Sequence, residues 1–195
     1  MLLGKIVKSN SHIDYVCQVY GRGEVPEPPP REAHPFGAFV SIELNGRDRL
    51  VGLVYNSMLF NPEFGRFGPR LSSEVDLAVF SPDYLQEKAL LLGIIAVGVL
   101  REQSCLQGVP PVSAAGEARV ETLESNLVRR FHEQRGWLQV QYLPLLQAQS
   151  LPLAQILARR VVDQLLHLFP QQAPLLHVLA DFFAWQSQVS PLGGN

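Results

Sequence analysis

The residues best suited to chemistry lie close together near the amino terminus. His12 and Asp14 are two positions apart on the edge of a predicted strand, so their side chains face the same way, with Ser9 and Ser11 nearby. A serine, histidine and aspartate relay, or a weak metal site, would use such groups. A relay, however, needs groups that reach one another from separate elements around a cleft. We therefore interpret these residues as a polar turn, and an enzymatic use of His12 or Asp14 would need a residue distant in sequence.

The other ionisable residues do not predict a second centre. His132, His167 and His177 lie among apolar residues in predicted helices, and no two have the i, i+4 spacing of a shared metal ion. We interpret them as histidines at the edge of the core, each satisfied by a backbone carbonyl. The carboxylates of Glu43 and Asp181 are the two that most merit inspection. Because the phosphate-loop pattern G-x-x-x-x-G-K-[ST] is missing as well, we expect no catalytic residue, metal or cofactor.

The clearest element that could position functional groups is a β-hairpin predicted over residues 36–56. Two strand-forming runs flank Asn45-Gly46, a dipeptide that favours the positive φ angles of a tight turn. The first run has one apolar face and one face with polar groups, whereas the return run is apolar on both faces. A doubly covered strand fits a small closed barrel. Four side chains of this hairpin should be buried: Val40, Ile42, Leu53 and Val54.

Four further segments before residue 101 have strand character, which gives about six strands in total. They are residues 4–8, 14–20, 75–79 and 89–100. Five prolines within residues 21–35 predict a loop of polyproline character. A proline-rich docking motif is the alternative, but the loop has no PxxP repeat with basic anchors at both ends.

The second half of the chain has helical character. The small, turn-rich residues 107–120 predict a linker. A helix is expected from 121 to 135, and a short strand from 137 to 143 that Pro144 ends. Two apolar helices follow, one ending at Pro170 and one opening at Pro174.

These elements predict an α+β protein, a small six-stranded β-barrel followed by a carboxy-terminal α-helical region. The expected division is a barrel over 1–106, a linker over 107–120 and a helical appendage with one short strand over 121–190.

The composition excludes several classes of protein. With 195 residues and a net charge of -2, the chain has no global positive field for nucleic acid or an anionic membrane. Hydrophobic residues make up 47% and charged residues 17%, so we expect a partner to cover part of the surface. The longest uncharged apolar run, residues 89–100, is too short to span a membrane. The two separated cysteines, Cys17 and Cys105, predict reduced thiols in a cytoplasmic protein.

Two regions are candidate contact surfaces. One is the aromatic loop over residues 57–71, expected as an ordered rim of the barrel, and the other is the last helix. The loop's aromatics and arginines could stack on single-stranded nucleic acid, although aromatics that fasten the loop to the barrel are the simpler interpretation. The candidate contact residues are Phe60, Phe64, Arg66, Phe67, Arg70, Phe182, Phe183 and Trp185.

The first hundred residues resemble a known family. The segments run in the order GKIVKSNSHIDYVCQVYG, FGAFVSIEL, RLVGLVYNSMLFNPEF, DLAVFSPDYL and LLLGIIAVGVL, leading into Pro110-Pro111. This order resembles the HAS-barrel, a six-stranded barrel at the amino end of HerA-type DNA translocases and of rotary ATP synthase α and β subunits. The resemblance implies a collar that packs subunits into a ring. Because the P-loop motor domain of those families is replaced here by the helical region, the resemblance implies docking or assembly, with no catalytic residues to carry over.

We therefore expect a cytoplasmic, non-catalytic interaction or assembly module. It would dock through its barrel and its apolar carboxy-terminal helices onto a protein partner or onto itself. The alternatives are a nucleic-acid-associated adaptor related to HerA-type translocases and an enzyme of unrecognised type.

Overall fold

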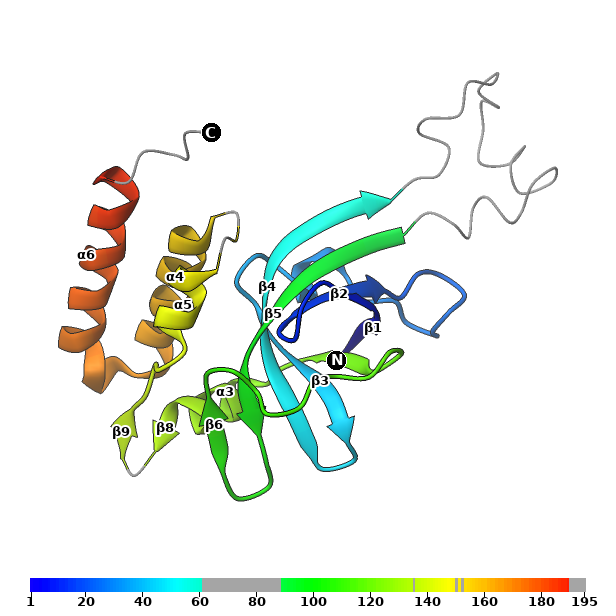
Figure 1. The fold of residues 1–195 in the computed structure, drawn as a ribbon, viewed down its shortest axis with the longest axis horizontal. Helices are drawn as coiled ribbons and strands as arrows, with labels where there is room; N and C mark the ends of the chain where they lie inside the picture. Colours follow the sequence, from blue (N-terminus) through cyan, green and yellow to red (C-terminus); the bar gives the residue numbers. More distant parts are fainter. Residues whose placement is uncertain (61–88, 135, 150, 152, 190–195) are drawn as a thin grey trace.

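The structure is a computed structural model that describes residues 1–60, 89–134, 136–149, 151 and 153–189. It contains a closed antiparallel barrel of six strands and, in the described ranges, four α-helices that lie mostly in the carboxy-terminal part (Figure 1). The predicted fold class, α+β with a small six-stranded barrel, is therefore confirmed. The expected strand at 75–79 lies outside the described residues.

The barrel closes because the two strands at the ends of its hydrogen-bonded order pair with each other. The strands are β1 (Leu2–Ser9), β2 (Asp14–Val19), β3 (Phe39–Asn45), β4 (Asp48–Phe60), β5 (Ala89–Leu100) and β7 (Arg119–Thr122). They follow the order β2-β1-β7-β3-β4-β5, and β2 pairs with β5 to complete the ring. A short strand, β6 (Cys105–Gln107), pairs with β5 outside the ring.

The predicted hairpin is present as β3 and β4. Phe39 lies opposite Leu53, and the pairing continues to Asn45 opposite Asp48. The four side chains expected to be buried, Val40, Ile42, Leu53 and Val54, are at most 1% exposed. The expected positive φ at the turn is wrong, since Gly46 does not take it. Instead the Asn45 Oδ1 accepts a hydrogen bond from the Asp48 amide at 3.1 Å, and this side-chain bond closes the turn.

Strand β7 corrects the expected boundaries of the barrel. It pairs with β1 and β3 and completes the ring, although its residues fall in the expected linker and at the start of the expected helical appendage. The barrel therefore extends beyond residue 106. The strand is too short for a recognisable alternation, because Val120 is its only fully buried side chain and Arg119, Glu121 and Thr122 are polar.

The helical region also begins and ends differently from the prediction. Its helices are α3 (Ser125–His132), α4 (Leu143–Ala148), α5 (Ala154–Leu168) and α6 (Ala173–Val189). The expected strand at 137–143 contains only β9 (Trp137–Leu138), which pairs with β8 (Glu133–Gln134). Pro144 lies in the first turn of α4, where proline is tolerated, rather than ending a strand. The predicted helical hairpin is present as α5 and α6, joined by the 3-10 turn Pro170–Gln172.

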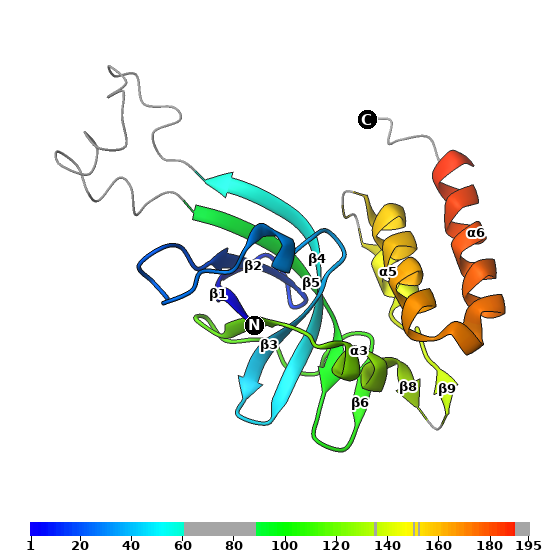
Figure 2. The ribbon, with the colours of Figure 1, turned by 180° about the vertical axis from the view of Figure 1, so that it is seen from behind.

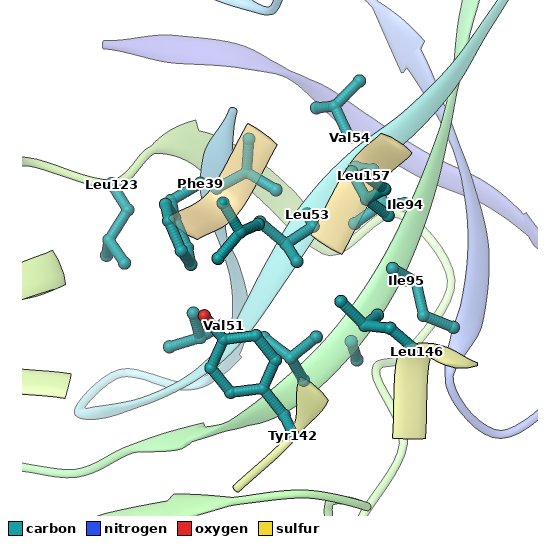
Figure 3. Packing of buried hydrophobic residues seen from close by; sticks show 14 of the residues in the cluster. Phe39, Val51, Leu53, Val54, Ile94, Ile95, Leu123, Tyr142, Leu146 and Leu157 are labelled. Atoms are coloured by element: carbon teal, nitrogen blue, oxygen red, sulfur yellow. The ribbon is translucent and has the colours of Figure 1, made fainter. Parts of the chain in front are cut away.

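The helices pack on the outer face of β3, β4 and β5. Figure 3 shows Tyr142, Leu146 and Leu157 beside side chains of these strands, among them Leu53 and Ile95. All belong to one buried cluster, so barrel and helices share a core. Helix α5 lies between the barrel and α6 in both ribbon views (Figures 1 and 2). This arrangement explains why both faces of β4 are apolar: one lines the barrel and the other supports the helices.

Candidate functional site

The His12 and Asp14 corner is a hydrogen-bonded turn between β1 and β2. His12 Nε2 lies 2.8 Å from the Pro110 carbonyl oxygen, whereas Asp14 accepts bonds from the Tyr55 hydroxyl at 2.8 Å and from Asn10 Nδ2 at 3.1 Å. Burial, reinforced by the bond to Asp14, raises the pKa of Tyr55, which keeps its hydroxyl protonated. His12 and Asp14 thus bond to different partners. The bonds to Pro110 and Tyr55 fasten distant segments of the fold together, whereas the bond from Asn10 lies within the turn.

A second tyrosine secures the same corner. The Tyr15 hydroxyl donates to the His12 carbonyl at 2.6 Å and accepts from the Ala114 amide at 3.1 Å. It thereby joins the turn to the segment that leads into β7. The Ser11 Oγ accepts bonds from the amides of Ile13 and Asp14, as in a side-chain-closed turn. These contacts support the interpretation of this corner as a structural turn.

His132 was missed as a member of the deep core. It is fully buried and lies between the rings of Phe39, Phe131, Phe169 and Tyr142. Its Nδ1 donates to the Val128 carbonyl at 2.7 Å, so its Nε2 accepts from the Tyr142 hydroxyl at 2.7 Å. Burial lowers the pKa of His132 to about 4, and the ring is therefore neutral at pH 7. Because Tyr142 is fully buried too, this pair holds α3 to α4 and offers no surface to a substrate.

Both thiols are poor nucleophiles. Cys17 is fully buried, and this burial raises its pKa to about 12. Burial also raises the pKa of Cys105, although Gln134 and Arg130 act in the opposite direction. Thiols that stay protonated react slowly.

Charged residues gather on the outer face of β3, β4 and β7, where they line a cavity of about 190 Å³. Glu43, Arg49, Arg119 and Glu121 are among its lining residues, and Arg49 Nη1 lies 3.3 Å from Glu121 Oε2. The signs alternate along this face, so the charges compensate one another. Among the residues that the structure describes, no three His, Cys, Asp or Glu side chains are close enough to share a metal ion.

The proline-rich loop forms one wall of a larger groove of about 990 Å³. Pro28, Pro29 and Pro30 lead into the 3-10 turn Arg31–Ala33, and His34 lies buried at its end. Leu59 and Leu90, at the ends of β4 and β5, form part of the opposite wall. These strand ends adjoin residues 61–88, which lie outside the described ranges.

The candidate contact residues have different positions. Phe64, Arg66, Phe67 and Arg70 lie outside the described residues, and so does the expected loop from residue 61 onward. Its first four residues, 57–60, are not a loop: they extend strand β4, which ends at the exposed Phe60. Phe183 is buried. Phe182 and Trp185 are exposed and lie on a different face of α6 from Phe183.

Two further residues of α6 belong with Phe182 and Trp185 and were not identified from the sequence. Leu175 and Val178 are exposed and precede them at intervals of three and four residues. The exposed fractions of the four side chains are 49% for Leu175, 66% for Val178, 45% for Phe182 and 59% for Trp185. We call these four residues the α6 stripe. Their spacing was visible in the sequence, but α6 is apolar almost all round, which hides the face that packs inward.

The fold and these surfaces define an α+β protein in which a closed barrel carries a packed helical hairpin with an exposed apolar stripe. The chain belongs to the family described as "Domain of unknown function (DUF8166)", whose sequence model matches residues 1–192. The family unit thus includes the barrel and the helices together. No curated protein matches the chain. None of the helices in the described ranges is long and apolar enough to cross a membrane.

Proposed function

We propose that this chain is a non-catalytic assembly module, in which the barrel is a scaffold and α6 is the surface that contacts another protein. The observation that carries the proposal is the α6 stripe, four large apolar side chains exposed side by side on one helix. Single exposed apolar residues are ordinary, but a contiguous apolar row is characteristic of a contact surface.

The packing of α6 supports this role. Leu176, Ala180 and Phe183 are buried, and α5 lies between α6 and the barrel (Figure 1). A Gln147 to Gln186 side-chain bond of 2.6 Å adds a link between α4 and α6. Helix α6 is therefore held firmly on one side while its other side remains apolar and exposed, as a preformed docking helix requires.

The chemistry of α6 favours a protein as the partner. The helix has no lysine or arginine, and Asp181 is its only charged residue. Binding to nucleic acid or to an anionic membrane draws on basic residues near the contact. An apolar helix or groove of another protein matches the stripe better.

Two further properties are part of the proposal. The HAS-barrel resemblance, with its collar-like role, supports assembly by a chain that has a barrel and no phosphate loop. A cytoplasmic location is supported by two free cysteines, Cys17 and Cys105, neither joined in a disulfide.

Site-specific photo-crosslinking in the native host tests the proposal. A photo-reactive amino acid replaces Val178 in the stripe or, as the matched control, the adjacent exposed His177, which lies on a different side of the helix. We expect a discrete protein adduct at position 178 and none at 177. Equal labelling at both positions, or none at either, contradicts the proposed role of α6.

A further inference from the structure

The α6 stripe has the spacing of a coiled-coil seam. Leu175, Val178, Phe182 and Trp185 follow one another at intervals of three, four and three residues, which are the a and d positions of a heptad. Such a seam is used when one helix packs along another at a shallow angle. The stripe therefore fits a second helix better than it fits a small ligand or an irregular surface.

We propose that the partner of the stripe is α6 of a second copy of this chain, packed antiparallel. This inference rests on the proposed function and names the partner. In this arrangement Trp185 of each copy lies opposite Leu175 of the other, and Phe182 lies opposite Val178. A two-fold axis then crosses the helix pair at the level of residue 180, so the same patch is used by both copies, as a closed dimer requires.

The sizes of the side chains favour this direction. Antiparallel pairing gives every layer one aromatic and one aliphatic side chain, so all four layers of the seam have similar width. Parallel pairing would place Trp185 against Trp185 and Val178 against Val178. Layers of such unequal width leave gaps or force the helices apart, and both reduce packing.

The helix dipoles favour the same direction. They oppose one another in an antiparallel pair, whereas they are aligned in a parallel pair.

The exposed area sets the strength of the dimer. Each of the four side chains exposes on the order of 100 Å², so the two stripes together bury on the order of 800 Å². Stable interfaces bury about 1,200–2,000 Å². Even with the half-buried Leu179 at the flank, we expect a reversible dimer with a dissociation constant in the micromolar range. Helix α6 lies at the outer edge of the molecule in both views, where a second copy can approach it (Figures 1 and 2).

Sedimentation equilibrium of the full chain tests self-association. We expect a monomer-dimer equilibrium, and we expect Val178→Glu to raise the dissociation constant at least about thirtyfold because it places a charge in the seam. His177→Glu introduces the same charge beside the stripe and should change the constant less than about threefold. Circular dichroism verifies that both variants are folded. A dimer that Val178→Glu leaves intact overturns the assignment to the stripe.

Disulfide trapping tests the direction. In a Cys105→Ala background, Leu175→Cys and Trp185→Cys chains are mixed and oxidised. Antiparallel packing should give mostly the mixed disulfide, because the two positions are then at the same level. In a parallel pair they are about 15 Å apart along the axis, so that pair would give homodisulfides instead. Homodisulfides as the main product overturn the proposed register.

The two proposals fail in distinguishable ways. A chain that stays monomeric up to about 200 µM, a concentration far above a micromolar dissociation constant, overturns self-pairing alone. The crosslinking experiment then decides whether α6 contacts a different protein. An adduct at position 178 with the mass of two chains supports self-pairing, and an adduct of any other mass contradicts it while supporting the assembly role.

Discussion

The Tyr142 hydroxyl donates to His132 Nε2 across 2.7 Å, and both side chains are fully buried. This bond joins the end of α3 to the residue that caps α4, and the His132 ring also touches Phe39 of the barrel. A neutral histidine therefore lies where the barrel and the helices meet. We therefore expect the attachment of the helical region to the barrel to be sensitive to pH.

Acidification should destabilise the fold through His132. Its pKa is about 4 in the folded chain, below the ordinary 6.5, so the unfolded chain binds more protons between these values. Stability thus rises with pH across this window and is lost as pH falls from about 6.5 to about 4. The expected loss is about 3 kcal/mol, since one pKa unit corresponds to about 1.4 kcal/mol. Urea unfolding at pH 7.5 and pH 4.5 measures it.

The control for this effect is a histidine variant outside the core. His132→Gln should remove the part of the pH dependence of the unfolding free energy that comes from this histidine. His177→Gln, at an exposed position of α6, should show the same pH dependence as the parent chain. If His132→Gln retains the full pH dependence between 4 and 6.5, another group causes it and this account of His132 is wrong.

Tyr142→Phe should weaken the fold without opening a large cavity. It removes only the hydroxyl, which leaves His132 Nε2 buried without its donor. An unsatisfied buried acceptor costs about 1–3 kcal/mol. Thermal unfolding at pH 7.5 measures the loss, and Tyr20→Phe, on a less buried tyrosine, is the matched control. Equal small effects of the two substitutions would show that the buried bond contributes little.

Gln107 links β6 to the end of α3 and to the segment after β9. Its Nε2 donates to the carbonyls of Phe131 and Gln139, each at 2.9 Å, and its Oε1 accepts from the Gln141 amide at 2.7 Å. Gln107→Ala should therefore lower stability by about 2–3 kcal/mol, because three backbone groups lose their partner. Hydrogen exchange should show faster exchange at Gln141. Protection unchanged at that amide would contradict the role of Gln107.

Gly98→Ala should disturb the contact between β5 and α3. A Cβ at this position would overlap the Leu106 carbonyl oxygen and lie 2.8 Å from Phe131 Cζ. Overpacking of this kind costs about 1–3 kcal/mol. Gly46→Ala is the control, since a Cβ there meets no atom within 4 Å. Equal unfolding midpoints for the two variants would mean that β6 and α3 move away from β5 at no cost in stability, and would contradict this prediction.

The parts of the fold with long, regular patterns were predictable from the sequence. The hairpin of β3 and β4 was predictable because two long strand-forming runs flank Asn45-Gly46, and α5 and α6 because each carries a sustained apolar pattern next to a proline. Strand β7 was not predictable from the sequence, since a four-residue strand with one buried side chain shows no detectable alternation of apolar and polar residues. Its position depends on pairing with β1 and β3, which are far away in the sequence.

The candidate surface was predictable only in part. The sequence singled out Phe182 and Trp185 but grouped them with Phe183, because a helix apolar all round does not reveal which face packs inward. That choice depends on where α5 lies. The paired roles of His132 and Tyr142 were hidden for the same reason, since their contact depends on where α4 lies relative to α3.

The neighbouring residues Phe182 and Phe183 offer the sharpest test of whether α6 has one buried face and one free face. Phe183 is 3% exposed and Phe182 is 45% exposed, although their rings are in contact. Phe183→Ala should therefore lower the free energy of unfolding by about 3–4 kcal/mol, as expected for a phenylalanine removed from a core. Phe182→Ala should change it by less than about 1 kcal/mol and should instead weaken self-association at least about tenfold. Chemical unfolding and sedimentation equilibrium on the same samples separate the two effects. If Phe182→Ala destabilises the monomer as much as Phe183→Ala does, the stripe belongs to the core and α6 has no free face to offer a partner.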